Sequence, residues 1–296
     1  MQSGKGINCL SVFDGISCGQ IALERAGIKV DKYFASEIDK YAVEITQKNY
    51  PNTIQLGDVR DIDFTQFEDI DLLIGGSPCQ NLSICGNRQG LEGSESKLFF
   101  EFVRALKGLK PKYFLLENNA SMTQENADII SSYLGVQPIM INSALVSAQQ
   151  RKRLYWTNIP NITQPKDREI YLEDIIDFNF IGTNLINEVK FNNAIEAYTN
   201  KPLRIGTIGK GGQGERVYSI KGKSINLVAN GGGRGAKTGL YKIGSTVRKL
   251  TSIEAERLQT LEDNYTQGIS ETQRLKLLGN GWTVDVIAHI FKGLKE

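Results

Sequence analysis

The sequence predicts an α/β fold in which a largely parallel sheet is covered by helices on both faces and is accompanied by a smaller β-rich lobe. Between residues 7 and about 159, short β-rich runs alternate with helical stretches, as in successive βαβ units. From about 160 to 246 the composition shifts to Asn, Gly and Lys, and helical periodicity returns after that. We therefore expect domains at 1–160 and 161–246, with 247–296 returning to the first.

Seven strands are expected in the first domain. They are INCLSVF (7–13), KYFAS (32–36), TIQLGD (53–58), IDLLIGG (70–76), KYFLLE (112–117), PIMINSALV (138–146) and RLYWTNI (153–159). Stretches such as GQIALERAG (19–27) and KYAVEITQKNY (40–50) repeat apolar residues at helical spacing. Near the C-terminus, Thr251 and Glu254 predict a capping box, and a last helix is expected from Gly281 or Val284.

Polar side chains follow the expected strands where each strand ends. They are Asp14, Glu37, Asp58, Cys79 and Glu117. Ligands of open parallel sheets bind beyond the carboxyl ends of the strands. We therefore expect these five side chains to converge on one crevice.

Composition excludes several classes of protein. The chain is 40% hydrophobic and 23% charged, and it has no apolar run near the ~20 residues of a spanning helix. The N-terminal stretch lacks the pattern of a signal peptide, so a cytoplasmic location is expected. Four cysteines without a CxxC pair and a single histidine argue against a zinc site or a disulfide framework. His289 lies in an apolar helical stretch, where a structural role is expected over a catalytic one.

The net charge of +2 conceals a basic segment in an acidic chain. Residues 201–249 hold eleven Lys or Arg residues and one acid, giving +10, whereas the rest has 24 basic and 32 acidic residues, giving −8. This pattern suits phosphate contacts, although a solvated charged loop would look similar. Twelve of the 30 glycines lie here. The runs VYSI, INLV and LYKI favour a small folded β-rich lobe over a disordered linker.

A glycine-containing turn follows the first strand in VFDGISCGQ. Gly15 and Gly19 would let a ligand approach the backbone, and Glu37, about 20 residues on, is placed to accept hydrogen bonds from ribose hydroxyls. The spacing is not GxGxxG. A nucleoside-containing cofactor would fit this arrangement. The alternative is a glycine turn and a strand-end acid that have only a structural role.

Two further motifs follow apolar strands. In GGSPCQNLS (75–83), a proline beside Cys79 favours a rigid loop that presents the sulfur, and the alternative is a buried structural cysteine. In LLENN, Glu117 could meet the Watson–Crick edge of a pyrimidine, and the alternative is a helix N-cap by Asn118 or Asn119.

Taken together, these motifs resemble those of the cytosine-C5 DNA methyltransferases of bacterial or phage type, in the family's order and along nearly the whole chain. FDGISCG is similar to the cofactor loop, GGSPCQNLS to the nucleophile loop, ENN to the ENV motif and QQRKR to the QxRxR motif. RKLTSIEAERLQ and GNGWTVDVIAHI resemble the two C-terminal motifs, and the basic stretch takes the place of the target-recognition region. The resemblance implies a Rossmann-like S-adenosylmethionine-dependent methyltransferase sheet with a small β-rich target-recognition lobe.

The resemblance also implies roles for individual residues. Catalytic roles fall to Cys79, Glu117, Arg151 and Arg153. The cofactor S-adenosyl-L-methionine would be lined by Phe13, Asp14, Gly15, Gly19, Glu37, Ile38, Asp58, Val59, Pro78, Asn280 and Val284. Contacts to DNA would come from Gln80, Ser83, Arg204, Arg216, Arg234 and Lys237. Two residues depart from the family pattern, Asn119 in place of valine and Gly281 in place of a frequent serine.

The implied reaction moves a methyl group to C5 of a cytosine flipped out of double-stranded DNA, through a covalent bond between Cys79 and C6. The products are methylcytosine and S-adenosyl-L-homocysteine. A monomer is expected, with a cognate restriction endonuclease as a genetic partner. The rival interpretations are a tRNA-modifying relative, an inactive DNA-binding protein with a retained pocket, and a nicotinamide oxidoreductase. For GGGRGAKTG, a loop that approaches the DNA backbone competes with a flexible surface turn.

Overall fold

The computed structural model describes residues 5–76, 96–180, 186, 188–231 and 234–295, and they fall into two compact units. Unit 1 comprises the described residues of Met1–Ile141, Lys152–Gln164 and Ile287–Glu296, and unit 2 those of Asn142–Arg151 and Pro165–Val286. These boundaries differ from the expected ones, because residues 247–286 belong to unit 2 and only the last ten residues return to unit 1.

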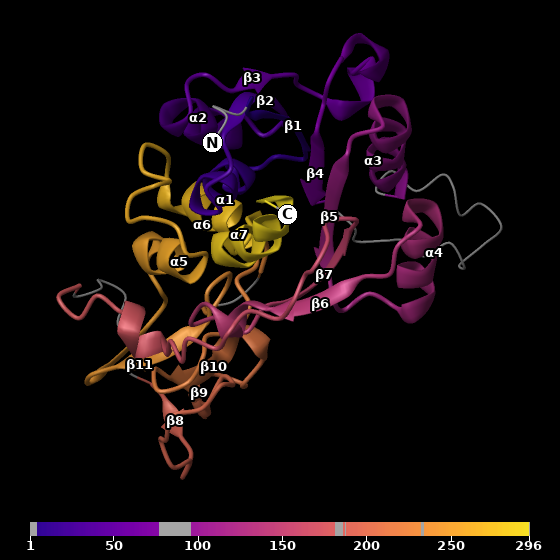
Figure 1. Ribbon diagram of the computed structural model, residues 1–296. Coiled ribbons are helices and arrows are strands. Elements are labelled where there is room, and N and C mark those ends of the chain that lie inside the picture. The colour runs from indigo at the N-terminus through magenta and orange to yellow at the C-terminus, as the bar shows by residue number, and fades with distance from the viewer. Residues whose placement is uncertain (1–4, 77–95, 181–185, 187, 232–233, 296) are drawn as a thin grey trace. The chain divides into compact units, whose positions relative to one another are not determined.

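Unit 1 is built around a seven-stranded sheet with the strand order β3-β2-β1-β4-β5-β7-β6 (Figure 1). Its strands are β1 (Ile7–Val12), β2 (Val30–Ser36), β3 (Ile54–Gln55), β4 (Leu72–Gly76), β5 (Tyr113–Asn119), β6 (Ile139–Asn142) and β7 (Lys152–Thr157). All seven lie within or overlap the predicted runs. The pairs from β3 through to β5 are parallel, whereas β5 and β7 are antiparallel. The predicted α/β fold is confirmed, and β7 makes the sheet mixed.

Helices cover both faces of this sheet. They are α1 (Cys18–Arg25), α2 (Lys40–Asn49), α3 (Ser96–Leu109) and α4 (Gln124–Leu134). Side chains alternate between the two faces along a strand. One face contributes Leu10, Leu73 and Phe114, which are in register across three strands, to a core shared with α3 and α4. On the other face, α1 approaches β4 at Ile74. The carboxyl ends of the parallel strands therefore emerge between helical layers.

Unit 2 contains a second sheet, of five strands in the order β12-β11-β10-β9-β8. The strands are β8 (Lys190–Phe191), β9 (Arg204–Thr207), β10 (Arg216–Ser219), β11 (Leu240–Ile243) and β12 (Thr246–Arg248). They enclose a small core that includes Ile205, Val217 and Leu240. The basic glycine-rich segment is therefore a folded β-rich lobe, as predicted, and not a disordered linker.

The C-terminal helices are α5 (Ser252–Leu258), α6 (Glu271–Asn280) and α7 (Val284–Phe291). The predicted capping box is present: the Glu254 backbone N–H donates to Thr251 Oγ1 over 3.2 Å, and the Thr251 N–H donates to Glu254 Oε2 over 2.8 Å. The same glutamate accepts two hydrogen bonds of 2.8 Å from Arg248. This buried ion pair ties the end of β12 to the first turn of α5.

Short 3-10 helices complete the described chain. They are η1 (Val59–Asp61), η2 (Phe64–Gln66), η3 (Ser143–Leu145), η4 (Leu172–Ile175), η5 (Gln213–Glu215) and η6 (Lys292–Lys295). Within the described ranges, none of the helices is long and apolar enough to cross a bilayer. His289 on α7 bonds to the Thr163 carbonyl oxygen over 2.8 Å, in keeping with the structural role expected of it.

Candidate active site

The loop between β1 and α1 forms the first part of the site. Three of its residues have positive φ angles: Phe13 at 58°, Gly15 at 61° and Ser17 at 56°. Such angles are uncommon for residues with side chains. They turn the chain sharply, so that α1 begins directly after the strand end. An added Cβ at Gly15 would meet nothing within 4 Å, so the backbone there is open to a ligand.

Glu37, at the end of β2, is held by backbone N–H groups. Its Oε2 accepts from Gly15 over 2.8 Å, and its Oε1 accepts from Ile38 and Asp39, each over 2.8 Å. A carboxylate has about four acceptor positions, so one position on Oε2 is left beside the three bonds. Ile38 next to it is 73% exposed. The loop after β1 and the end of β2 therefore offer an acceptor and an apolar surface side by side.

Asp14, in the same loop, is a half-buried carboxylate. It accepts hydrogen bonds from Tyr33 Oη over 2.8 Å and from Ser17 Oγ. Desolvation raises its pKa from 3.8 to about 6, with a smaller contribution from the charge of Glu37, and the hydroxyl donors oppose the shift. Sequence reasoning missed Tyr33, because a tyrosine in a strand shows no sign of a partner on the loop that follows the neighbouring strand.

We expect Asp14→Asn to stabilise the fold in a pH-dependent way. Because the pKa of Asp14 is higher in the folded state than in the unfolded state, ionisation of its carboxyl group destabilises the fold. This loss of stability is absent below pH 3.8 and complete above about pH 6. The rise of this pKa from 3.8 to about 6 corresponds to roughly 3 kcal/mol as an upper bound. Urea unfolding of both proteins from pH 4 to pH 8 should show the variant's advantage growing with pH. A pH-independent difference would contradict this. Asp58→Asn is the control: the lowered pKa of Asp58 stabilises the fold fully above about pH 3.8, so this variant should be less stable by a constant amount from pH 4 to pH 8.

Asp58 and Val59 form the third part of the site, after β3. Asp58 caps η1 by accepting from the Arg60 backbone N–H over 3.0 Å, and it also pairs with the Arg60 guanidinium. The hydrogen bonds from Arg60 lower the Asp58 pKa to about 2. The Ser36 hydroxyl donates to the Gly57 carbonyl oxygen over 2.8 Å, which ties this turn to the end of β2 next to Glu37.

Gly19 has a packing role that the sequence did not reveal. A Cβ there would lie 2.4 Å from Ile74 Cδ1 and 2.7 Å from Tyr33 Oη. Close approach of α1 to the sheet therefore explains this glycine, and its predicted place on the cofactor remains a prediction.

Glu117 and Arg153 form an ion pair at the sheet end. Arg153 Nε lies 2.8 Å from Glu117 Oε1, and both side chains are 11% exposed. Since Glu117 pairs with Tyr155 across the antiparallel β5 and β7, Arg153 is its diagonal neighbour on the same face. Glu117 also pairs with Gly76, the last residue of β4. The alternative role of the ENN motif as a helix cap does not hold, because Thr123 caps α4.

The predicted nucleophile lies outside the described residues, together with three other predicted site residues of the same loop. They are Pro78, Cys79, Gln80 and Ser83. In the sequence, Cys79 follows the last residue of β4 by three positions. Three residues of extended chain span at most about 11 Å.

Comparison with known proteins agrees with this arrangement. The family model described as C-5 cytosine-specific DNA methylase matches residues 7–296. The chain belongs to this family. It is 31% identical to the type II methyltransferase M.HhaI of Haemophilus parahaemolyticus, over 96% of this chain and 93% of that protein. It is 27% identical to the type II methyltransferase M.NlaX of Neisseria lactamica, over 97% and 95%.

Solved structures share the fold of the methyltransferase. The Entamoeba histolytica methyltransferase EhMeth matches with a TM-score of 0.74 at 20% identity, over 99% of this chain and all of that one. The S. pombe Dnmt2 methyltransferase matches with a TM-score of 0.70 at 16% identity, over 97% of both chains. The resemblance seen in the motifs is thus confirmed: the protein is a DNA cytosine-C5 methyltransferase, and S-adenosyl-L-methionine use follows from the family.

The described residues of the methyltransferase fit such a cofactor. The position left on Glu37 Oε2 can accept from a ribose hydroxyl, the exposed Ile38 can cover an adenine ring, and the open backbone at Gly15 leaves room for a ligand. Among the described residues, no group of His, Cys, Asp and Glu is arranged to hold a metal ion.

Arg151, the other arginine of the QQRKR motif, has a different environment from Arg153. It is 3% exposed, and its Nη1 donates to Asn226 Oδ1 and the Leu227 carbonyl oxygen, each over 3.0 Å. Its Nη2 donates to the carbonyl oxygens of Gly279 and Gly281 over 3.2 and 2.8 Å. These contacts, all within unit 2, give Arg151 a structural role at the end of α6. Its predicted catalytic role beside Arg153 remains a prediction.

The stretch GNGWTVDVIAHI begins at Gly279, in the last turn of α6. At Gly279 a Cβ would lie 2.3 Å from the Val228 carbonyl carbon, so only glycine lets α6 pack against this segment. Asn280 is exposed, whereas Val284 is fully buried and its N–H donates to the Gln259 carbonyl oxygen over 3.0 Å. The predicted cofactor contacts of Asn280 and Val284 remain predictions. Gly281, which departs from the family pattern, accepts from Arg151 through its backbone, so a side chain is not needed for this bond.

The four candidate DNA-reading residues in the basic segment differ in their surroundings. Arg204 and Arg234 are exposed. Arg216 is half-buried, with a buried Nε that has no hydrogen-bond partner. Lys237 donates to the Thr272 carbonyl oxygen over 3.0 Å, and desolvation lowers its pKa. The described part of GGGRGAKTG is held by backbone hydrogen bonds, including Gly235 N–H to the Gly214 carbonyl oxygen over 2.6 Å. These bonds argue against a flexible turn.

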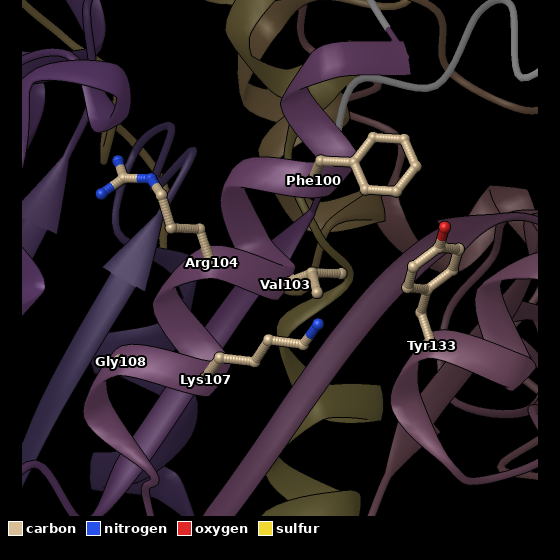
Figure 2. Close-up of a pocket in the computed structure, with 6 residues that line it drawn as sticks. All are labelled: Phe100, Val103, Arg104, Lys107, Gly108 and Tyr133. Carbon is tan, nitrogen blue, oxygen red and sulfur yellow. The ribbon is translucent and has the colours of Figure 1, made fainter. Parts of the chain in front are cut away.

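A groove elsewhere in unit 1 has a volume of about 590 Å³ and lies between α3 and α4 (Figure 2). Its lining residues are Phe100, Val103, Arg104, Lys107, Gly108 and Tyr133. None of them belongs to the predicted site, and Phe100 packs edge-on against Tyr133, with ring centroids 5.2 Å apart. The groove is therefore a feature of the helical layer, separate from the strand ends that carry the site.

Proposed function

We propose that this methyltransferase transfers a methyl group from S-adenosyl-L-methionine to C5 of a cytosine flipped out of a short specific sequence in double-stranded DNA. The reaction proceeds through a covalent intermediate between Cys79 and C6. The observation that carries the proposal is the ion pair of Glu117 and Arg153 at the end of β5, directly across from the end of β4, three positions before Cys79. Flipping costs a few kcal/mol, since the target atoms are inaccessible inside a duplex.

The chemistry follows from the groups at the strand ends. Cys79 Sγ adds to C6 as a thiolate, and the electron pair of the C5–C6 double bond moves to C5, which makes C5 nucleophilic. Glu117 binds N3 and the exocyclic amine, where negative charge develops, and Arg153 holds the Glu117 carboxylate in place. S-adenosyl-L-methionine, when bound, supplies the methyl group that C5 takes up. A base then removes the C5 proton, and the electron pair expels the thiolate from C6.

The cofactor is held by the loop after β1 and the ends of β2 and β3. Glu37 accepts from the ribose hydroxyls, with its free acceptor position on Oε2. Asp58 accepts from the adenine amine and shares its carboxylate with Arg60, while the Val59 N–H donates to the adenine ring. Ile38 covers the ring, and Phe13, Asp14 and Gly15 line the loop. These contacts use acceptors and backbone groups that the strand ends already present.

Double-stranded DNA is the partner that the basic segment suits. Arg204 and Arg234 are exposed and available for phosphate or guanine contacts. We further propose that the enzyme acts as a monomer in the cytoplasm, with a restriction endonuclease as a genetic and not a physical partner.

The test is to map methylcytosine after purified protein, plasmid DNA and S-adenosyl-L-methionine are incubated together. Bisulfite sequencing should find methylcytosine at one position of one short sequence, and none without cofactor. Total tRNA is treated in parallel. Methylation of tRNA alone would replace the proposal with the tRNA-modifying alternative, and binding of DNA with no modification of either substrate would favour the inactive binder.

Neutralising the exposed arginines of unit 2 should weaken the salt dependence of DNA binding. Each phosphate contact contributes about 0.9 to the slope of log K against log salt. The double variant Arg204→Gln, Arg234→Gln is therefore expected to reduce the slope by up to about 2. Fluorescence anisotropy between 50 and 300 mM salt measures it, with Lys32→Gln on β2 as the matched control. An unchanged slope would place the DNA contacts elsewhere.

A further inference from the structure

Arg104 on α3 takes no part in the mechanism described above. It nevertheless contacts the turn that holds Asp58 and Val59. Its side chain is 41% exposed, and it lines the edge of the groove in unit 1. Figure 2 shows that its guanidinium points away from the Tyr133 ring on the other side of this groove. The groove therefore does not explain this arginine, and its contacts on the opposite side do.

The guanidinium forms a clamp on the 59–64 turn. Nη2 donates to the Val59 carbonyl oxygen and Nη1 to the Ile62 carbonyl oxygen, each over 2.7 Å. The guanidinium carbon lies 4.4 Å from the centre of the Phe64 ring. On the helix side, Nε donates to Glu101 Oε2 over 2.7 Å. A planar fork with fixed donors meets two carbonyls in one geometry, which a lysine ammonium cannot reproduce.

The turn itself has weak internal bonding. Its two backbone hydrogen bonds run from the Asp61 N–H to the Asp58 carbonyl oxygen over 3.1 Å and from the Ile62 N–H to the Val59 carbonyl oxygen over 3.4 Å. Both are longer than the usual 2.9–3.0 Å. The bonds from Arg104 are shorter and charge-assisted, so they are the stronger restraint on the direction of the Val59–Arg60 peptide, whose N–H donates to Asp58 Oδ1.

We propose that Arg104 is a positioning residue that sets the adenine selectivity of the cofactor site. The inference rests on the proposed placement of Asp58 and Val59 at the adenine edge. Asp58 requires a donor at position 6 of the purine, and the Val59 N–H requires an acceptor at N1. Hypoxanthine presents a carbonyl at position 6 and an N–H at N1, so it mismatches both groups. Arg104 keeps these two groups in register and thereby maintains the discrimination.

The experiment compares the affinity of S-adenosylhomocysteine with that of S-inosylhomocysteine by isothermal titration calorimetry. Arg104→Met removes the donors and keeps much of the apolar stem, and Arg104→Lys keeps the charge but cannot bridge two carbonyls. Both variants should bind S-adenosylhomocysteine about 10-fold more weakly, as expected for about one lost charge-assisted hydrogen bond. Their preference for adenine should fall by the same factor, while kcat at saturating S-adenosylmethionine stays unchanged. Lys107→Met, one turn along α3, is the matched control and should match the wild type.

Separate outcomes distinguish failure of the inference from failure of the proposed site. If Asp58→Ala leaves the preference for adenine intact, the placement of Asp58 at the adenine is wrong. If Asp58→Ala abolishes the preference but both Arg104 variants retain it, Arg104 does not position the site. Weaker binding of both ligands by an equal factor would reduce Arg104 to a structural role and would also overturn the inference. Should Arg104→Met fail to fold, Arg104→Lys alone decides.

Discussion

Cys79→Ala is expected to abolish methyl transfer while DNA and cofactor binding persist. Without the thiolate no covalent bond to C6 can form, and C5 of a neutral cytosine is too weak a nucleophile to take the methyl group. We expect the rate of a single turnover to fall by at least about 10⁴-fold, in the range found when enzymes lose their nucleophile. Transfer of tritiated methyl groups to a defined duplex measures it, and electrophoretic mobility shift checks DNA binding.

Cys9 on β1 provides the matched control. It is fully buried, and its pKa is raised by desolvation and by the nearby charges of Asp14 and Asp71. A neutral buried thiol is not a nucleophile. Cys9→Ala should therefore cost only about 1 kcal/mol of stability, through the atom removed from the core, and leave turnover intact at 25 °C.

Duplex DNA with 5-fluorocytosine at the target position sharpens this comparison. Fluorine at C5 blocks the proton removal that completes the reaction, so the Cys79–C6 bond should persist in denaturing gels. Wild type and Cys9→Ala should both form the trapped complex, and Cys79→Ala should not. A trapped complex with Cys79→Ala would mean that another group attacks C6, and the covalent scheme through Cys79 would have to be abandoned.

The strands of unit 1 were predictable because each is a short apolar run that ends in turn residues. The same logic located Glu37, Asp58 and Glu117, since polar side chains at strand ends are visible in the sequence. The antiparallel direction of β7 was not visible, because the apolar pattern of RLYWTNI carries no sign of direction. Tertiary pairing alone fixes it.

Roles that depend on long-range partners were missed for a related reason. Arg151 and Arg153 are two residues apart in one motif, yet Arg153 pairs with Glu117 and Arg151 bonds to backbone near the end of α6. Gly19 belongs to the glycine turn by sequence but is required by the side chains of Ile74 and Tyr33. Arg104 was missed because an arginine on an amphipathic helix is usually a solvated surface residue.

The boundary at residue 246 was placed where glycine-rich composition gives way to helical periodicity. The structure instead joins α5 and α6 to unit 2. The ion pair between Arg248 and Glu254, with side chains 4% and 0% exposed, ties the last strand of the lobe to α5. A change of composition therefore marked the end of the sheet and not the end of the unit.

Glu117→Gln is expected to lower kcat by about 10²–10⁴-fold, the usual contribution of a positioned acid or base. The amide keeps the size and an oxygen that can accept from Arg153, but it cannot take up or give a proton at N3 of the base. Steady-state methylation at saturating DNA and cofactor measures the change. Affinity for S-adenosylhomocysteine should stay within about twofold, because Glu117 is proposed to bind the cytosine base and not the cofactor.

Arg153 supplies the complementary variant. Arg153→Met removes the partner of a carboxylate that is only 11% exposed. Breaking a buried pair from one side costs about 3–5 kcal/mol, because the remaining charge is left without compensation. Urea unfolding should therefore show a larger loss of stability for Arg153→Met than for Glu117→Gln, whereas both lose activity. The double variant Glu117→Gln, Arg153→Met should recover much of the stability without recovering turnover. If Glu117→Gln kept full kcat and lost only stability, the pair would be a structural ion pair, and the proton at N3 would have to be handled by another group.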